Sequence, residues 1–489
     1  MKNISTQKGF MLVGILVFAS IAMVIMTAVI GGAVANVRLS EKIYNRERAF
    51  HLGEAGNEYY RWHLAHSNLD FKDGNATSGP YVHQMVDKFG TPIGSFSLNI
   101  IPPISGSTVV KIQSTGSVIT ASTTRKIQTT LAIPSLAKYA VAANDAIRFG
   151  QGTEVFGPIH SNNGVRFDGL SHNIISSAVS SYDDPDHSGA VEFAVHTHVT
   201  EPPGSGAIDT FRTLEAPPSA VPSRPDIFIA GRQFPVPTFD FTGITSDLAS
   251  IKSQAISAGR YFSASNGVGY RILLKTNDTF DLYKVTALDT VTRSCELNSG
   301  GDTIVGWGTW SIKATSGQTF LQNYPIPANG LIFLEDNVWV DGQINTARVT
   351  IASGRFPDNS TTRPSITVNN NLLYTNYDGQ DVVALISQGD FNVGLASDDN
   401  LRIDAALVAQ NGRAGRYRYH SSCGANYIRN SLTLYGMIAT SKRYGFAYTD
   451  GTGYGIRNIN YDANLLYGPP PSFPLTTSQY STISWEELK

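Results

Sequence analysis

The clearest pattern in the sequence is an uninterrupted apolar segment near its start. From Phe10 to Val37, 28 consecutive residues carry no charged side chain. A helix needs ~20 apolar residues to cross the ~30 Å hydrocarbon core of a bilayer, whereas the apolar region of a cleaved secretory signal spans only ~7–15 residues. The segment therefore predicts a transmembrane helix over residues 10–37. Lys2 and Lys8 favour a cytoplasmic N-terminus, although the basic residues between 38 and 48 weaken that preference.

The helical pattern continues beyond the apolar segment. Leu39, Ile43 and Phe50 recur on one face, and apolar residues follow at intervals of three and four as far as Trp62. We therefore expect one helix that continues to about residue 64. Its first half would lie in lipid, and its amphipathic second half would pack against a folded body or another helix.

Strand patterns follow the predicted helix. Apolar and polar residues alternate over Ser95–Ile101, Thr108–Ser114 and Arg125–Leu131, and turn residues separate these runs. Alternation with a period of two is typical of strands with one buried face. The sequence thus predicts a small antiparallel sheet within a membrane-proximal module over residues 38–134.

A weak repeat occupies much of the remaining chain, in which an apolar, a small and a second apolar residue alternate with variable positions. The small residues at the centres of its copies are Gly157, Gly342, Ala384, Ala405 and Gly436. Adjacent copies 42 and 21 residues apart fit rungs of ~20 residues. We expect a β-solenoid, a right-handed parallel β-helix, that starts over 135–180 and continues over 330–468. Glycine or alanine would allow a tight corner or the close approach of a neighbour. A β-sandwich is the alternative, because alternation is common to both folds.

Residues 181–329 interrupt this repeat and are predicted to form an inserted accessory lobe. The lobe contains a helical pattern over Ser246–Ala258 and a hairpin that pairs Tyr270–Leu274 with Thr279–Thr286. A run of three prolines then closes the solenoid and leaves a C-terminal tail over 469–489. The predicted fold class is therefore mainly β, preceded by a transmembrane and amphipathic helix.

Composition narrows the class of partner. The 489 residues include 37 basic and 39 acidic side chains, and no basic cluster interleaves with aromatic residues. We therefore expect no nucleic-acid partner. The two cysteines, Cys295 and Cys423, lack the spacing of zinc ligands. Outside the cytoplasm they could form a disulfide or remain two buried thiols.

Two motifs at the ends of the predicted helix resemble those of a known family. Lys8-Gly9-Phe10 precedes the apolar segment, and a second motif contains Ala49, Phe50, Leu52, Glu54, Ala55 and Gly56. Both are similar to the N-terminal region of PilX-type minor pilins, which belong to type IV pilus systems. The resemblance covers roughly the first 65 residues.

This resemblance implies a processing site and a membrane topology. Gly9 and Phe10 would flank the cleavage point of prepilin peptidase, which would remove a cytoplasmic leader over residues 1–9. Glu54 would be the acidic residue of the second motif. Pilins that pack into a fibre usually have glutamate at the fifth mature position, whereas this chain has Gly14 there. Minor pseudopilins that are thought to sit at a pilus tip also lack this glutamate.

Two polar segments offer candidate metal ligands. Asp183, Asp184, Asp186 and His187 crowd a turn-rich segment, whose oxygens could bind calcium or form a solvated acidic turn. His196-Thr197-His198 places two imidazoles on one side of a strand, a geometry that metals use. No third ligand is evident near them in the sequence, so we expect no metal site.

The remaining candidates concern catalysis. Parallel β-helices often cleave glycans with carboxylates on one face, so Asp398, Asp399 and Asp404 are candidates, although such residues are also usual in loops between rungs. The sequence contains no nucleophile elbow and no glycine-rich phosphate loop. We therefore expect neither an enzyme nor a cofactor.

Taken as a whole, the sequence favours a single-pass protein of a bacterial envelope, with a cytoplasmic N-terminus and a β-rich domain outside the cytoplasm. The expected function is that of a minor pilin-like or pilus-assembly protein that displays this domain for adhesion. Its expected partners are the lipid bilayer, other pilin-like subunits, prepilin peptidase and a surface glycan or protein. The alternative is a membrane-anchored glycan-active enzyme.

Overall fold

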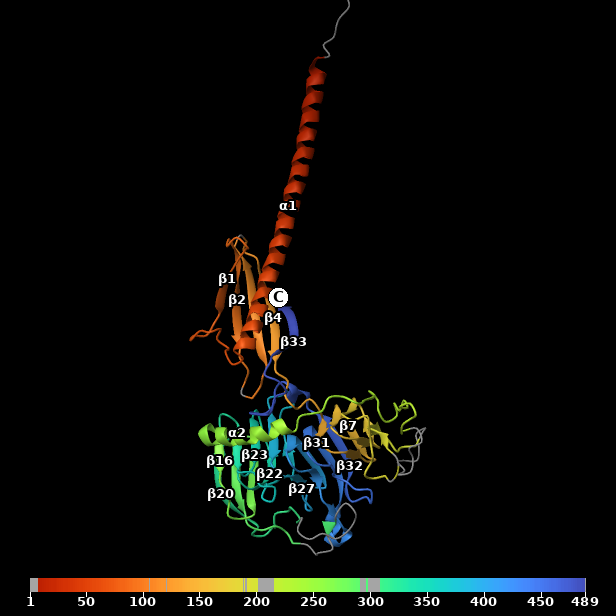
Figure 1. Cartoon of the computed structure of the whole chain (residues 1–489). Helices are drawn as coiled ribbons and strands as arrows, with labels where there is room; N and C mark the ends of the chain where they lie inside the picture. Colours follow the sequence, from red (N-terminus) through yellow and green to blue (C-terminus); the bar gives the residue numbers. More distant parts are fainter. Residues whose placement is uncertain are drawn as a thin grey trace, which may run out of the picture. The chain divides into compact units, whose positions relative to one another are not determined.

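The structure, a computed structural model, consists of two compact units and confirms the mainly β fold class (Figure 1). It describes all residues except 1–7, 105, 120, 188, 190, 201–214, 291–295, 298–307 and 489. The helix–sheet unit comprises Met1–Pro102, Val109–Ala132 and Ser478–Lys489. The β-helix-like unit comprises Pro103–Thr108 and Ile133–Thr477.

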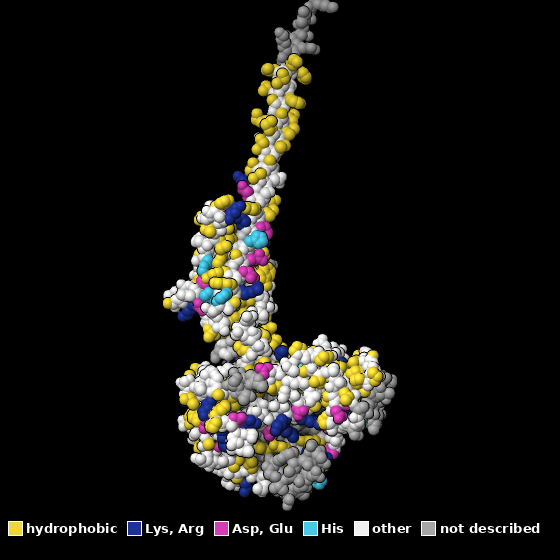
Figure 2. Space-filling view, in the orientation of Figure 1, with side chains coloured by type: hydrophobic (Ala, Val, Ile, Leu, Met, Phe, Trp, Pro, Cys, Tyr) yellow, Lys and Arg dark blue, Asp and Glu magenta, His cyan; other side chains and the backbone are white. Residues whose placement is uncertain are grey.

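The helix–sheet unit is built on α1 (Lys8–His66), one continuous helix. From Phe10 to Val37 it carries exposed apolar side chains and no charged ones (Figure 2). The hydroxyls of Ser20 and Thr27 donate to main-chain carbonyls of the preceding turn, Ser20 to Val17 and Thr27 to Met23. These two hydroxyls are therefore satisfied within the helix, as an apolar solvent requires.

The second part of α1 packs on an antiparallel sheet of order β1-β2-β3-β4-β33. Its strands are β1 (Tyr81–Val86), β2 (Pro92–Ile101), β3 (Val110–Val118), β4 (Thr124–Ala132) and β33 (Ser481–Leu488). The runs Ser95–Ile101 and Arg125–Leu131 lie in β2 and β4, and the run Thr108–Ser114 overlaps β3, which begins at Val110. Their buried positions form a core with the helix that includes Tyr60, Leu64, Phe96, Ile112 and Leu131.

The C-terminal residues, predicted as a tail, add the edge strand β33 to this sheet. β33 pairs antiparallel with β4, where Trp485 lies opposite Thr129. Phe50 of α1 contacts the Trp485 ring edge-to-face, with 6.0 Å between ring centroids. The chain thus leaves the helix–sheet unit after β4 and returns to complete it, so Ile133–Thr477, the main part of the β-helix-like unit, is inserted between two neighbouring strands.

The strands of the β-helix-like unit pair mostly in parallel, but they do not stack in chain order. The first set stacks as β5 (Val141–Ala143), β8 (Ile159–Ser161), β11 (Ile175–Ser177) and β15 (Arg232–Gln233). The second set starts afresh and stacks as β16 (Arg260–Phe262), β21 (Leu331–Leu334), β23 (Arg348–Ser353), β26 (Val382–Ser387), β28 (Asn400–Ala409) and β31 (Ile428–Thr440). The end of β31 pairs with β5, so the last rungs stack on the first.

Other strands complete the remaining faces of the rungs. One face contains β10 (Leu170–Ser171), β7 (Thr153–Phe156), β32 (Gly453–Tyr461), β25 (Leu372–Leu373), β22 (Asn337–Gln343) and β17 (Gly269–Lys275), together with the start of β28 and β31. Parallel pairing also joins β24 (Ile366–Thr367), β27 (Phe391–Val393) and β29 (Ala414–Arg416). A separate three-stranded sheet contains β6 (Ile147–Phe149), β9 (Val165–Phe167) and β14 (Val195–His196). Short pairs are β12 (Ser181–Tyr182) with β13 (Glu192–Phe193) and β19 (Glu296–Leu297) with β30 (Arg418–Tyr419). Among the described residues, the short helices are η2 (Ser421–Cys423), η3 (Ala425–Tyr427) and η4 (Ala463–Leu466).

The segment predicted as an accessory lobe contains both of its expected elements. α2 (Thr242–Ala258) covers the helical pattern, and β17 pairs antiparallel with β18 (Thr279–Val285) as the predicted hairpin. β20 (Gln318–Pro325) continues this antiparallel extension. However, β16 and β17 also pair in parallel with β21 and β22, so this part of the lobe continues the main sheet.

A buried arginine makes hydrogen bonds across the contact between the last and first rungs. Arg457 of β32 lies opposite Thr153 of β7. Its guanidinium donates to the carbonyl oxygens of Tyr454 and Gly455 on its own strand, at 2.8 and 2.6 Å, and to the oxygens of Gly150, Gln151 and Thr153 across the contact. Burial lowers the pKa of Arg457 from its ordinary value, but the carbonyls satisfy its hydrogen-bonding groups.

Replacing Arg457 by methionine should reduce the stability of the β-helix-like unit by about 3 kcal/mol, because several buried carbonyls lose their donor at once. Scanning calorimetry of the full chain in detergent measures the effect. Arg363→Met is the control, since Arg363 makes a partly exposed ion pair with Asp358 whose loss should cost less than about 1 kcal/mol. Equal losses in the two variants would contradict the role given to Arg457.

Candidate functional site

The second motif of α1 forms the surface that packs on the sheet. Ala49 and Leu52 are buried there, Gly56 is also buried, and Ala55 is half-buried. These positions recur at intervals of three and four, so they share one face of the helix. The small residues of the motif therefore have a structural reason, which is to let the helix approach the strands.

The closest approach lies between α1 and Gly116 of β3. A Cβ atom placed on Gly116 would come within 2.0 Å of the Ala49 carbonyl oxygen and 2.4 Å of the Gly53 nitrogen. On the helix, a Cβ on Gly56 would lie 2.2 Å from the Ser114 hydroxyl oxygen. Glycines on both surfaces thus allow the two backbones nearly to touch.

Other residues of the two motifs lie away from this contact. Glu54 is partly exposed and pairs with His51 at 3.0 Å, so its carboxylate is not used in the core. Phe10 is 88% exposed, and a Cβ atom placed on Gly14 would have no described neighbour within 4 Å. Gly9 lies in the first turn of α1. The proposed cleavage point between Gly9 and Phe10 stays a prediction.

The apolar part of α1 is long and apolar enough to cross a membrane, and none of its most apolar stretch is buried in the protein. A helix of this kind near the N-terminus is compatible with a single-pass anchor, and a signal sequence has the same features. The exposed side chains that Figure 2 shows along it would be costly in water. The segment therefore requires an apolar environment, in lipid or against other helices.

The two cysteines can be placed only in part. Cys295 lies outside the described residues, whereas Cys423 is half-buried in η2. Glu296, the residue after Cys295, pairs with Tyr419 in the β19–β30 ladder. This pairing brings the two chain segments together, and the disulfide stays a prediction.

The carboxylates considered for glycan cleavage accept hydrogen bonds from residues of neighbouring rungs. Asp398 accepts a hydrogen bond from the Asn371 main chain at 3.1 Å, and Asp399 accepts one from the Asn430 main chain at 3.0 Å. Asp404 is fully buried and accepts from the Tyr374 main chain and the Tyr377 hydroxyl, at 3.0 and 2.7 Å. Each of the three therefore has a structural role in the stacking.

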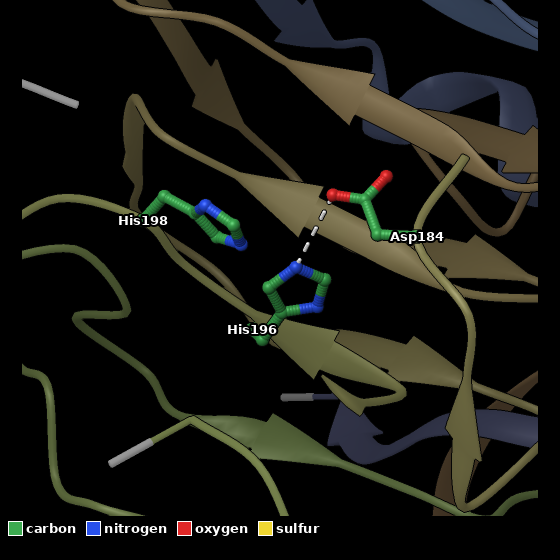
Figure 3. Close-up of side chains that lie close together, drawn as sticks. All are labelled: Asp184, His196 and His198. Atoms are coloured by element: carbon green, nitrogen blue, oxygen red, sulfur yellow. Dashed lines mark ion pairs between the residues drawn. The ribbon is translucent and has the colours of Figure 1, made fainter. Parts of the chain in front are cut away.

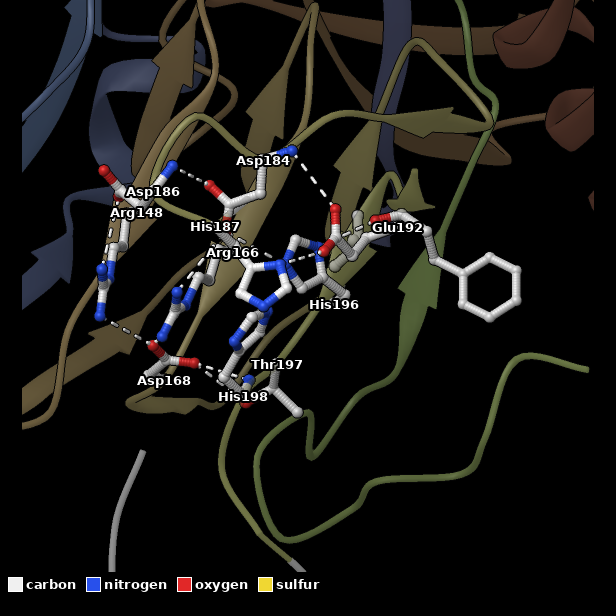
Figure 4. A network of polar contacts seen from close by, with 12 residues as sticks. Arg148, Arg166, Asp168, Asp184, Asp186, His187, Glu192, His196, Thr197 and His198 are labelled. Carbon is white, nitrogen blue, oxygen red and sulfur yellow. Dashed lines mark hydrogen bonds and ion pairs between the residues drawn. The ribbon is translucent and has the colours of Figure 1, made fainter. Parts of the chain in front are cut away.

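The four acidic-segment residues do not converge on a calcium site. Asp183 is exposed, and Asp186 pairs with Arg443 and, at 3.5 Å, with Arg148. His187 pairs with Glu192 at 3.0 Å. Asp184 instead turns into the protein, where its carboxylate faces other partners (Figure 4).

Those partners are His196 and His198. The acidic segment and the His-Thr-His motif, which are separate candidates in the sequence, therefore form one cluster. One potential ligand atom from each of Asp184, His196 and His198 lies within 4.8 Å of the other two (Figure 3). All three residues are buried, with at most 2% of their surface exposed. The third ligand is not evident from the sequence because Asp184 lies in the connection between β12 and β13, 12 residues before His196, and only the fold brings the two together.

Electrostatics make these groups suitable ligands. Burial and the nearby Arg166 guanidinium lower the pKa of His198 to about 4, so its ring is neutral at physiological pH. Burial tends to raise the pKa of Asp184, but the approach of His196 and Arg166 holds it below its ordinary value. A neutral imidazole and an ionised carboxylate are the forms that bind metals.

Comparison with known proteins assigns no family. No protein-family model matches the sequence, and no curated protein matches it. Among solved structures, the chain is similar to the competence-associated pilin ComZ from Thermus thermophilus, with 12% sequence identity and a TM-score of 0.31. The match covers 91% of this chain and 97% of ComZ. At this TM-score we draw no functional conclusion from the similarity.

Proposed function

We propose that this protein is a membrane-anchored, pilin-like subunit that displays its β-helix-like unit outside the cytoplasm for contact with a surface. The observation that carries the proposal is the construction of α1. Its residues from Phe10 to Val37 are apolar or uncharged and mostly exposed, and its second half packs against the sheet of the helix–sheet unit. Such a helix joins a bilayer or a helical bundle to an exterior domain.

The insertion of the β-helix-like unit supports a display role. Because this unit leaves after β4 and returns before β33, the helix–sheet unit keeps both neighbouring strands and the whole of its helix contact. The anchor is therefore complete without contribution from the inserted rungs. Those rungs form a large and rigid surface, which suits contact with a glycan or protein.

The exposed apolar half of α1 and the resemblance of its motifs to pilins indicate the expected partners. The apolar half of α1 would pack in lipid or against other pilin-like subunits, and prepilin peptidase would process the chain between Gly9 and Phe10. Gly14 in place of an acidic residue favours a minor subunit or an assembly role over a repeating fibre component. The glycan-active alternative has no observation in its favour, since Asp398, Asp399 and Asp404 are all engaged in rung stacking.

N-terminal sequencing of the full-length protein extracted from membranes tests this proposal. We expect the mature chain to begin at Phe10, and the variant Gly9→Leu to retain residues 1–9 because the leader no longer ends in a small residue. Gly14→Ala is the matched control and should be processed normally. A wild-type chain that keeps its leader would contradict processing as a pilin.

Anchoring and topology need a separate measurement. The protein should resist extraction of membranes by alkaline carbonate, and protease added outside spheroplasts should digest the β-helix-like unit. Full release by carbonate would remove the membrane anchor from the proposal. Complete protection from the protease would remove display outside the cytoplasm.

A further inference from the structure

We propose that Asp184, His196 and His198 bind one divalent transition-metal ion, which their chemistry identifies as zinc. Nitrogen donors from two imidazoles and one carboxylate oxygen form a donor set that zinc commonly uses. Calcium would require six to eight oxygen ligands, and this cluster offers too few. The site is independent of the proposed anchoring function.

The spacing of the ligand atoms fits a tetrahedral ion. Oδ2 of Asp184 lies 3.6 Å from Nε2 of His196. Two ligands at the usual zinc distance of ~2.0–2.1 Å are separated by ~3.4 Å when the geometry is tetrahedral. A small inward movement of the His198 ring from its present distance, within 4.8 Å, would complete the set. In Figure 3 the His196 ring points toward the Asp184 carboxylate, and the His198 ring lies beside that of His196, with 5.1 Å between ring centroids.

The hydrogen bonds around the ligands select the atoms that face the ion. Nδ1 of His196 lies 3.0 Å from the main-chain carbonyl oxygen of Phe193. A carbonyl can only accept, so Nδ1 carries the proton and Nε2 of a neutral ring presents a lone pair. Oδ1 of Asp184 accepts from the Asp186 main chain at 3.0 Å, which leaves Oδ2 to face that lone pair. Metal-binding histidines are usually oriented by such a hydrogen bond to a carbonyl.

This arrangement leaves two electron-rich atoms facing each other in a buried site. Neither Oδ2 of Asp184 nor Nε2 of His196 has a hydrogen-bond partner among the described residues. Buried polar atoms without partners are costly. Nη1 of Arg166 also lies 3.6 Å from Oδ2, so the guanidinium offsets part of the carboxylate charge but makes no hydrogen bond to this oxygen. A cation between Oδ2 and Nε2 removes the remaining cost, and that cation is either a metal ion or the proton of an imidazolium.

Ion pairs surround the ligands. Arg166 is buried and donates to Asp168 at 2.8 Å, and Glu192 pairs with His187 at 3.0 Å (Figure 4). Asp186 is paired with Arg443 and Arg148. Oδ2 of Asp184 remains the carboxylate oxygen that faces His196.

A bound ion would link two segments of the β-helix-like unit. Asp184 lies just after β12, whereas His196 ends β14, which pairs in parallel with β9. The metal would therefore tie the β12–β13 hairpin to the rung that contains β9. Three protein ligands leave a fourth position on a tetrahedral ion, which water can occupy.

Metal analysis of the untagged full-length protein, purified in detergent without chelator, tests the site. We expect about one zinc per chain, and at least a tenfold lower zinc content in Asp184→Asn and in His196→Asn. His172→Asn is the matched control, because His172 is partly exposed and pairs with Glu154 at 2.7 Å outside the cluster. Unchanged zinc content in the two ligand variants would overturn the proposal.

A second measurement does not depend on the folding of any variant. Wild-type protein stripped with a chelator and titrated with cobalt should show the visible absorption of four-coordinate cobalt, saturating at one ion per chain. Adding zinc to the stripped protein should abolish that absorption and raise the melting temperature by several degrees. If cobalt gives no such absorption and zinc leaves the melting temperature unchanged, the cation is the imidazolium proton and the metal site is disproved.

Discussion

Replacing Gly436 by valine should abolish the cooperative unfolding transition of the β-helix-like unit, with a loss of more than about 4 kcal/mol. Gly436 has φ of +147°, a backbone conformation that a β-branched residue adopts only with strain. A Cβ at this position would also lie 2.0 Å from the carbonyl oxygen of Ala405 on the neighbouring rung. The backbone strain and the steric overlap both destabilise the folded state. Neither can be relieved by moving a side chain, because both involve backbone atoms.

The position of Gly436 explains why the effect should be large. It is the last residue of β31 that pairs with β32, and the part that pairs with β5 begins two residues later at Ile438, so the strand changes partners here. Calorimetry and circular dichroism of the full chain measure the loss. Gly445→Ala is the control, since Gly445 has no neighbour within 4 Å of a Cβ and no positive φ. A Gly436→Val protein that melts within about 2 °C of wild type would show that this position tolerates a side chain.

Local sequence patterns predict the elements whose partners lie nearby. The alternation of Ser95–Ile101 and Arg125–Leu131 corresponds to β2 and β4, because one face of each strand is buried against α1. The prediction that helix continues from the apolar segment to about Leu64 agrees with α1, which ends at His66. In these segments the hydrophobic period and the tertiary packing agree, so the pattern alone is sufficient.

The features that the sequence does not reveal are pairings between distant segments. Nothing in residues 481–488 indicates that their partner is β4, because nearly every residue of this edge strand is exposed and the strand therefore shows no alternation of buried and exposed positions. The pairing of β31 with β5 cannot be predicted from the sequence either, because the partner of a parallel strand depends on how all of the rungs stack. The repeat does indicate where small residues are needed, and Gly342 and Gly436 both have positive φ there.

The candidate metal site shows the same limit at the level of single residues. The spacing of His196 and His198 is visible in the sequence, and so is the acidic segment that contains Asp184. Their meeting depends on the β12–β13 hairpin, whose strands are only two residues long. Such short strands carry no recognisable alternation, so the two halves of the cluster look like unrelated candidates until the fold is known.

Replacing Gly116 by alanine should detach the second half of α1 from its sheet and reduce the stability of the helix–sheet unit by about 3 kcal/mol. The added Cβ would overlap backbone atoms of Ala49 and Gly53, so α1 would have to move away and withdraw Leu52 and Tyr60 from the core. Hydrogen exchange of the amides in the second half of α1 measures this directly, and we expect faster exchange there. Lys111→Ala, an exposed change on the same strand, is the control and should leave the exchange unchanged. Wild-type protection in Gly116→Ala would mean that the helix does not depend on a close approach to β3, and the structural reason given for the small residues of the second motif would be wrong.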